Sequence, residues 1–173
     1  MYEGGELALG KVLVDHEYGR IVWAMFLHAD EAHIFNNMLI LYFLGAMIEQ
    51  EIGHLRFGVA YFVSGSVGNL LSLAAKFVKM DTVPSVGASG AIFGLDGVML
   101  ALVLFSGKQM PNVTPIRVLL MIVLSLYSGF TAQNVDNAAH VGGLIAGFLL
   151  GAIFCMADRL YYNKKHGGDS IEY

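Results

Sequence analysis

A serine and a histidine in glycine-rich surroundings are the residues of this chain that could form a nucleophile and its base. Ser89 lies in the tetrapeptide Gly-Ala-Ser-Gly at 87–90, and His140 lies in Ala-His-Val-Gly-Gly at 139–143. A histidine within hydrogen-bond reach can take the serine proton and make the hydroxyl nucleophilic. A serine that begins a helix also lies beside unpaired backbone N–H groups, which can stabilise an oxyanion. Taken alone, the tetrapeptide is more typical of a helix cap or a packing serine, and the histidine could be a core residue bonded to a carbonyl.

Small residues accompany both side chains at helical spacing, and they predict that the two segments pack together. Those that share a face with His140 are Gly143, Gly147 and Gly151. Those that form a strip beside Ser89 are Gly90, Gly94 and Gly97. Residues three or four apart share a helix face, and small residues let two membrane helices approach closely. We therefore expect Ser89 and His140 to touch, at the same end of their two helices.

His33 and Asn37 could supply further donors to an oxyanion. They are four residues apart and so face the same way on a helix. Both side chains can donate hydrogen bonds, and beside Ser89 they would stabilise a tetrahedral intermediate. The alternative is that they only join helices within a membrane. Asp96 lies two helical turns after Ser89, about 10 Å along the axis, so we expect a structural hydrogen bond there rather than a third catalytic residue.

A metalloprotease is an alternative that the sequence does not favour. His28 and His33 flank two acidic residues, but they are five residues apart. The zinc-binding helical motif needs histidines four apart on one face. The lone cysteine, Cys155, can form neither an internal disulfide nor a metal site by itself. We therefore expect no metal and no other cofactor.

Five stretches with few charges are expected to position these residues as membrane helices. The chain is 56% hydrophobic and only 14% charged, whereas a soluble domain carries about 25% charge. Each stretch approaches the roughly 20 residues that a crossing needs. The stretches are 32–48, 57–75, 82–107, 118–135 and 137–157. The fold class that we predict is an all-α polytopic membrane protein, a helical bundle of about five transmembrane helices.

The bundle divides the chain into three parts and gives it an orientation. We expect an outer N-terminal segment with an interfacial loop at 1–31, the transmembrane bundle at 32–158, and a polar cytoplasmic tail at 159–173. The first residues have neither the basic nor the apolar part of a signal peptide. A weak excess of basic residues places the C-terminus in the cytoplasm. The residues on that side are Arg56, Lys108, Arg117, Arg159, Lys164 and Lys165.

Composition also limits the partners of this protein. The net charge is −4 and no basic patch stands out, which excludes nucleic acid as an expected partner. The lipid bilayer is the expected surrounding. A transporter would need an intramembrane acid such as Asp96 on a water path, and nothing else in the sequence supports that alternative.

Three motifs, in order and in separate predicted spans, resemble the rhomboid intramembrane serine proteases. The first is H-x4-H-x3-N, made by His28, His33 and Asn37. The second is Gly-x-Ser-Gly at 87–90, followed by Ala-Ile-Phe-Gly. The third is Ala-His-x-x-Gly-x-x-x-Gly at 139–147. None is decisive alone, but together they are specific, and the resemblance covers residues 20 to about 151.

The resemblance implies a catalytic serine–histidine dyad with Ser89 as nucleophile and His140 as general base. His33, Asn37 and the backbone N–H of Ser89 would form the oxyanion hole. Arg20 and Glu49 would form a charged pair that holds the first loop to the first span. The other residues with an implied structural role are His28, Gly87, Gly90, Phe93, Gly143 and Gly147.

The resemblance also implies a setting for the site. The loop 21–30 would lie in the outer membrane interface with Trp23 and Phe26 as anchors, and the connection 129–136 would cover the site. Substrates would be single-span transmembrane proteins, cut near the outer surface, and we expect a bacterial plasma membrane. A catalytically inactive relative that binds membrane proteins is the alternative.

Two departures from the family pattern are expected to matter. The family's core has six spans, and we expect that the helix before the first loop is missing here. Some members place a tyrosine four residues after the serine, stacked on the histidine. Phe93 stands there in this chain, and it keeps the ring without the hydroxyl.

Overall fold

The computed structural model describes residues 4–107, 110, 113–131 and 135–166. Helices account for almost all of the regular structure in these ranges, and the predicted all-α fold is confirmed. In chain order they are α1 (Leu9–Leu13), α2 (Arg20–Trp23), a short 3₁₀ helix η1 (Ala24–Phe26), α3 (Glu31–Ile52), α4 (His54–Lys79), α5 (Ser89–Phe105), α6 (Pro115–Thr131) and α7 (Asn137–His166).

Each of the five predicted stretches overlaps one of the long helices, from α3 to α7. Three of these helices, α3, α4 and α7, are long and apolar enough to cross a membrane, whereas α5 and α6 are shorter apolar helices of 17 residues. At 1.5 Å per residue, 17 residues extend about 25 Å, close to the thickness of a hydrocarbon core. Asp30 caps α3 by accepting a hydrogen bond from the backbone N–H of His33 at 2.7 Å.

Two of the predicted stretches differ in extent from their helices. In the stretch 82–107 the helix begins at Ser89, as expected for a serine that begins a helix, because residues 82–88 are held in an extended path. Ser85 exchanges two backbone hydrogen bonds with Leu7, at 2.9 and 3.1 Å, and the Gly87 N–H donates to the Ala24 carbonyl at 2.9 Å. The helix expected to end at 157 continues to His166. Charged residues after 157 do not end it, because Asp, Arg, Leu and Lys all tolerate a helix and no glycine or proline occurs before Gly167.

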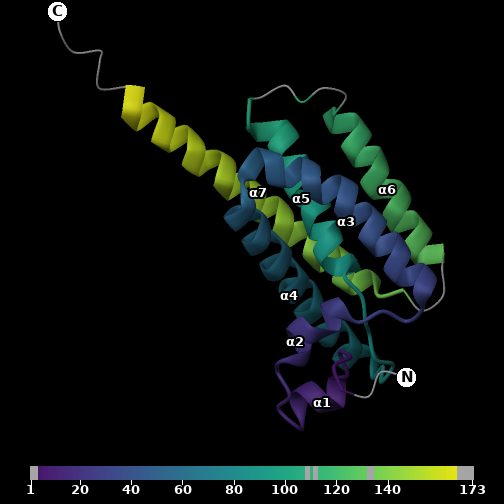
Figure 1. Cartoon of the computed structure of the whole chain (residues 1–173). Coiled ribbons are helices and arrows are strands. Elements are labelled where there is room, and N and C mark those ends of the chain that lie inside the picture. The colour runs from purple at the N-terminus through teal and green to yellow at the C-terminus, as the bar shows by residue number, and fades with distance from the viewer. Residues whose placement is uncertain (1–3, 108–109, 111–112, 132–134, 167–173) are drawn as a thin grey trace, which may run out of the picture.

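Helix α5 is the centre of the bundle and is in contact with α3, α4, α6 and α7. It lies in the middle of Figure 1, with α6 on the outside and the long α7 crossing behind. Most of its residues are buried, among them Leu95 and Val98, which are fully inaccessible. A helix that is apolar all round must be covered on every side. Its first residue, Ser89, is therefore presented at one end of a rigid, enclosed element.

The outer segment, residues 4–30, packs over the end of the bundle where α5 begins (Figure 1). Leu7, Val12 and Ala24 form a small buried cluster with Leu73 of α4. Trp23 and Phe26, the predicted interfacial anchors, are 65% and 51% exposed. Exposed aromatic side chains at this level are suited to a membrane interface.

The predicted pair between Arg20 and Glu49 is not formed. Arg20 is buried and pairs instead with Glu17 at 2.7 Å and Glu6 at 3.4 Å, both in the outer segment. Glu49 pairs with His54 at 2.6 Å. The physical reason is distance: Glu49 lies 18 residues into α3, about 27 Å from its start, whereas Arg20 lies in the outer segment that precedes this start.

Candidate active site

Ser89 and His140 meet where α5 and α7 begin. The Ser89 Oγ lies 2.8 Å from Nε2 of His140. His140 is only 6% exposed, and its ring stacks on Phe93 with a centroid distance of 4.3 Å and an angle of 20° between the planes. Phe93 lies one turn after Ser89 on α5, so one helix supplies both the hydroxyl and the ring that holds the imidazole. The expected contact between Ser89 and His140 is present.

Glycines bring these two side chains together. A Cβ on Gly143 would overlap the carbonyl oxygen of Gly90, and a Cβ on Gly147 would overlap the carbonyl oxygen of Gly94. The backbones of α5 and α7 therefore touch, which only small residues permit. We call this contact between α5 and α7 the glycine seam. It fixes the separation of the two helices and, with it, the distance between the hydroxyl and the imidazole.

No carboxylate in the described part of the chain is hydrogen-bonded to the second ring nitrogen of His140. Nδ1 is buried and has no hydrogen-bond partner among the residues that the structure describes. For Nε2 to accept the serine proton, the neutral ring must carry its proton on Nδ1. The geometry is therefore that of a two-residue pair rather than a triad.

His33, Asn37 and Gly87 form one wall of the site. A Cβ on Gly87 would lie 2.8 Å from Nε2 of His33 and 3.6 Å from Nδ2 of Asn37, so the two groups converge on one spot. The Ala29 N–H donates to Nδ1 of His33 at 3.4 Å, which leaves the neutral ring with its proton on Nε2. The Asn37 amide is buried, and its Nδ2 has no partner in the described ranges. Both side chains thus have a donor to offer.

Gly87 is the residue that permits this approach. Its φ of +127° lies in a region that favours glycine, and any side chain would collide with the imidazole of His33. The Gly87 N–H is bonded to Ala24. The turn before Ser89 is thereby held against the donors of α3.

These groups line a cavity of about 740 Å³ at the end of the bundle where α5 begins. Ser89, His140, His33 and Asn37 all contribute to its wall, and Phe130 of α6 closes another side. A cavity of this volume accommodates several residues of an extended peptide. Part of the connection 129–136, residues 132–134, lies outside the described residues, so the predicted cover over the site is described only at its two ends.

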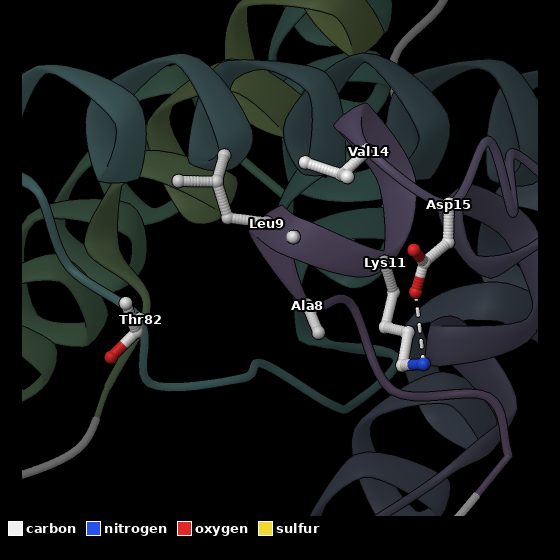
Figure 2. A pocket seen from close by; sticks show the side chains of 7 residues that line it. Ala8, Leu9, Lys11, Val14, Asp15 and Thr82 are labelled. Atoms are coloured by element: carbon white, nitrogen blue, oxygen red, sulfur yellow. Dashed lines mark ion pairs between the residues drawn. The ribbon is translucent and has the colours of Figure 1, made fainter.

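A second hollow of about 370 Å³ lies beside α1 and has a different character (Figure 2). Its polar feature is the ion pair between Lys11 and Asp15, at 2.9 Å. Its lining contains no serine, cysteine or histidine. Ser89 and His140 therefore line the larger cavity and not this hollow.

His28 and Asp96 lie outside the reacting group. His28 is 8% exposed and meets His33 edge-on with a centroid distance of 5.0 Å. Burial lowers the pKa of His28, and the neighbouring His33 lowers it further, so a neutral His28 ring packs against His33. Asp96 is buried inside α5, and its Oδ1 has no partner in the described part of the chain. The hydrogen bond expected for it is not seen at that oxygen.

The sequence analysis missed Asp136, which lies four residues before His140. Its carboxylate accepts hydrogen bonds from Ser72, Ser85 and the backbone of Ala139. Burial opposes the charged form of Asp136, but these three hydrogen bonds and the charge of Lys76 lower its pKa. Asp136 lies at the border of an apolar stretch, directly before α7. An aspartate in this position is typical of a helix cap, and that pattern could have indicated its importance.

Comparison with known proteins gives a consistent result. A profile of the Rhomboid domain matches residues 15–157. RHOMBOID-like protein 1 of Arabidopsis thaliana is 38% identical over 165 residues, which are 94% of this chain and 41% of that protein. RHOMBOID-like protein 7 of the same plant is 38% identical over 162 residues, 93% of this chain and 50% of that protein.

A bacterial relative is also similar. Rhomboid protease GluP of Bacillus subtilis (strain 168) is 35% identical over 154 residues, 89% of this chain and 29% of that protein. The chain therefore spans half or less of the length of these curated relatives. Since the Rhomboid domain extends over most of its sequence and includes every residue of the site, this chain belongs to the rhomboid family.

Proposed function

We propose that this protein is an intramembrane serine endopeptidase that cuts single-span transmembrane proteins. The observation that carries the proposal is the 2.8 Å contact between Ser89 Oγ and His140 Nε2 in a cavity that also holds His33 and Asn37. A nucleophile, a base and two converging donors are the groups that acyl transfer needs. The name of the relative GluP includes the word protease, which agrees with this chemistry.

In the proposed reaction, His140 accepts the Ser89 proton on Nε2 while the serine oxygen attacks a substrate carbonyl. The oxyanion of the tetrahedral intermediate receives hydrogen bonds from His33 Nε2, Asn37 Nδ2 and the Ser89 backbone N–H. His140 then gives its proton to the leaving amine, which leaves an acyl-enzyme on Ser89. Water attacks this ester with His140 again as the base, and the free carboxylic acid and serine are released.

The membrane supplies the substrate class and the orientation. Rhomboid proteins are integral membrane proteins, and the long helices of this chain are apolar enough to span a bilayer. Arg56 at the start of α4 forms a two-fold ion pair with Asp158 near the end of α7, at 2.7 and 2.8 Å. These ends therefore lie at one side of the membrane, opposite the cavity. Basic residues concentrate there, so we place this side in the cytoplasm; a bacterial plasma membrane remains a prediction.

The test is cleavage of a single-span protein after reconstitution in liposomes. Wild type is compared with Ser89→Ala and His140→Ala, with and without a metal chelator. Matched controls are Ser125→Ala on the exposed face of α6 and His54→Ala, whose side chain is 94% exposed. Activity that disappears only in Ser89→Ala and His140→Ala, and that survives the chelator, supports the proposal. Unchanged cleavage by Ser89→Ala contradicts it.

An inactive rhomboid protein that binds membrane clients is the second candidate. It is favoured by one observation: the plant relatives are named rhomboid-like and not protease. Such a protein would need neither the free Ser89 hydroxyl nor the base. Capture of the single-span protein without cleavage, equal in wild type and Ser89→Ala, would favour this candidate.

A further inference from the structure

Asp136 joins three parts of the molecule through one carboxylate. Its Oδ2 accepts a short hydrogen bond from Ser72 of α4 and one of 2.5 Å from Ser85, in the segment before Ser89. Its Oδ1 accepts from the backbone N–H of Ala139, in the first turn of α7, at 3.1 Å. The three partners come from positions 72, 85 and 139, which are far apart in the sequence.

The carboxylate is held as an anion. Burial disfavours its charge, but the two hydroxyls, the Ala139 N–H and the charge of Lys76 on α4 lower its pKa. Lys76 is itself fixed, since its Nζ donates to the Val83 carbonyl at 2.7 Å and lies 3.8 Å from Asp81. Hydrogen bonds to an ionised acceptor are stronger than those between neutral groups. The segment 81–85 is thus tied to α4 and to Asp136 together.

The partners of Asp136 lie next to the reacting groups without being part of them. Ser85 lies four residues before Ser89 in the sequence, and Ala139 directly precedes His140. No hydrogen bond joins Asp136 to the imidazole, and Nδ1 of His140 has no partner in the described residues. Asp136 is therefore not the acid of a triad. It connects the segment that leads to Ser89 with α7, whose first turn contains His140.

We infer that Asp136 is a positioning residue that aligns Ser89 with His140. Its carboxylate binds both Ser85 and the first turn of α7, and a hydrogen bond from Ser72 holds the carboxylate in place. This role rests on the proposed function. The glycine seam sets how close α5 and α7 lie, but it begins only at Gly90 and Gly143. The chain before Ser89 is held to the N-terminal segment by backbone bonds to Leu7 and Ala24, and the Ser85 hydroxyl adds the link to Asp136 at the start of α7. Misplacement of reacting atoms by about 1 Å can reduce a rate by about 100-fold.

The first test is Asp136→Asn in the reconstituted protein. The amide oxygen can still cap Ala139, but an NH₂ group then faces two serine hydroxyls. We expect kcat to fall by about 10- to 100-fold with KM changed by less than about twofold, because alignment and not binding is altered. Asp15→Asn is the matched control: it removes a carboxylate of the same kind outside this cavity, where Asp15 pairs with Lys11 at 2.9 Å, and it should change kcat by less than about twofold.

A double-mutant cycle shows whether the effect passes through Ser85. Ser85→Ala should lower kcat by about 10-fold, and the double variant with Asp136→Asn should be no slower than Asp136→Asn alone. Fully additive losses would overturn the inference. If Asp136→Asn does not fold, Ser85→Ala decides, because an unchanged kcat there contradicts a tether and a reduced one at constant KM supports it.

A readout without proteolysis separates this inference from the proposed function. The protein is labelled with ¹⁵N at its six histidines, and His140→Ala identifies the resonances of the His140 ring. Loss of alignment in Asp136→Asn should shift the resonance of His140 Nε2, which is bonded to Ser89, while Asp15→Asn should leave that resonance in place. If wild type cuts no substrate, the protease function fails, and this spectrum still decides on Asp136: an unmoved Nε2 resonance overturns the positioning role.

Discussion

Helices α7 and α6 both flank α5, and they meet it in opposite ways. Along α7 the contact is backbone on backbone, since side chains at Gly143 or Gly147 would enter the opposing carbonyls. Helix α6 buries only three of its 17 residues, whereas α5 buries twelve of 17. Figure 1 shows α6 at the outside of the bundle. One flank of α5 is rigid and the other is lightly attached.

In the proposed protease, this difference would separate two tasks. A reacting pair must keep its geometry, and close-packed backbones with few rotatable groups between them keep it best. Access from the membrane needs an element that can move at low cost, and few buried contacts are the physical mark of such an element. The glycine seam carries Ser89 and His140, while α6 carries Phe130, a wall of the cavity. The following predictions test that division.

The largest effect is expected for Gly147→Ala. The added methyl meets the Gly94 carbonyl, and backbone cannot move aside as a side chain can, so we expect destabilisation by about 3 kcal/mol. Thermal unfolding in detergent measures it. Gly58→Ala on α4 is the control, since a Cβ there has open space around it. Equal stability of the two variants would mean that the seam is not tightly packed.

The next effect concerns the ring that holds the base. Phe93→Ala removes the ring that stacks on His140. We expect kcat to fall about 10-fold, because an aromatic contact is lost and the imidazole is then free to leave its position. Phe93→Tyr retains the ring and should remain active within about twofold. Reconstituted cleavage assays measure both variants. An unchanged kcat in Phe93→Ala would show that the glycine seam positions His140 without the Phe93 ring.

A smaller effect is expected where α6 is attached to α7. The Asn137 amide donates to the Gly129 carbonyl at 3.1 Å, so Asn137→Ala should cost about 1 kcal/mol, the net value of one hydrogen bond. Amide exchange should rise in α6 and stay unchanged in α5. Hydrogen–deuterium exchange read by mass spectrometry distinguishes the helices. A rise in both would contradict an independently attached α6.

Acid should weaken the start of α7 before it affects α6. The pKa of Asp136 is lowered in the folded protein, so its stabilising contribution is complete above the ordinary aspartate pKa of about 3.9. It is lost as the pH falls through the lower folded value. The unfolding midpoint of wild type should therefore approach that of Asp136→Asn below about pH 4. A constant difference between the two down to pH 2 would assign the stabilisation to a group other than Asp136.

The smallest effect is expected for Leu120→Ala. This side chain is 53% exposed on α6, and exposed substitutions usually change stability by less than about 0.5 kcal/mol. Thermal unfolding and kcat should both match wild type. A large loss would show that α6 packs against a partner that the bundle alone does not contain.

The sequence alone determined the fold class and the chemical identity of the site. Apolar runs of nearly membrane length leave the backbone no choice but helices in a bilayer. Ser89, His140 and their glycines could be predicted because period and residue size decide which faces can touch. The local sequence pattern predicts these helix faces because residues three or four apart lie on the same face of a helix.

Apart from Ser89 and His140, only the tertiary structure decided which distant polar groups meet. It paired Arg20 with Glu6 and Glu17 rather than with Glu49, and it brought Ser72 and Ser85 to Asp136. It also joined the residues before Ser89 to Leu7 and Ala24 by backbone hydrogen bonds. These outcomes depend on which chain ends lie at the same membrane depth. Depth is set by the packing of whole helices and not by any local spacing.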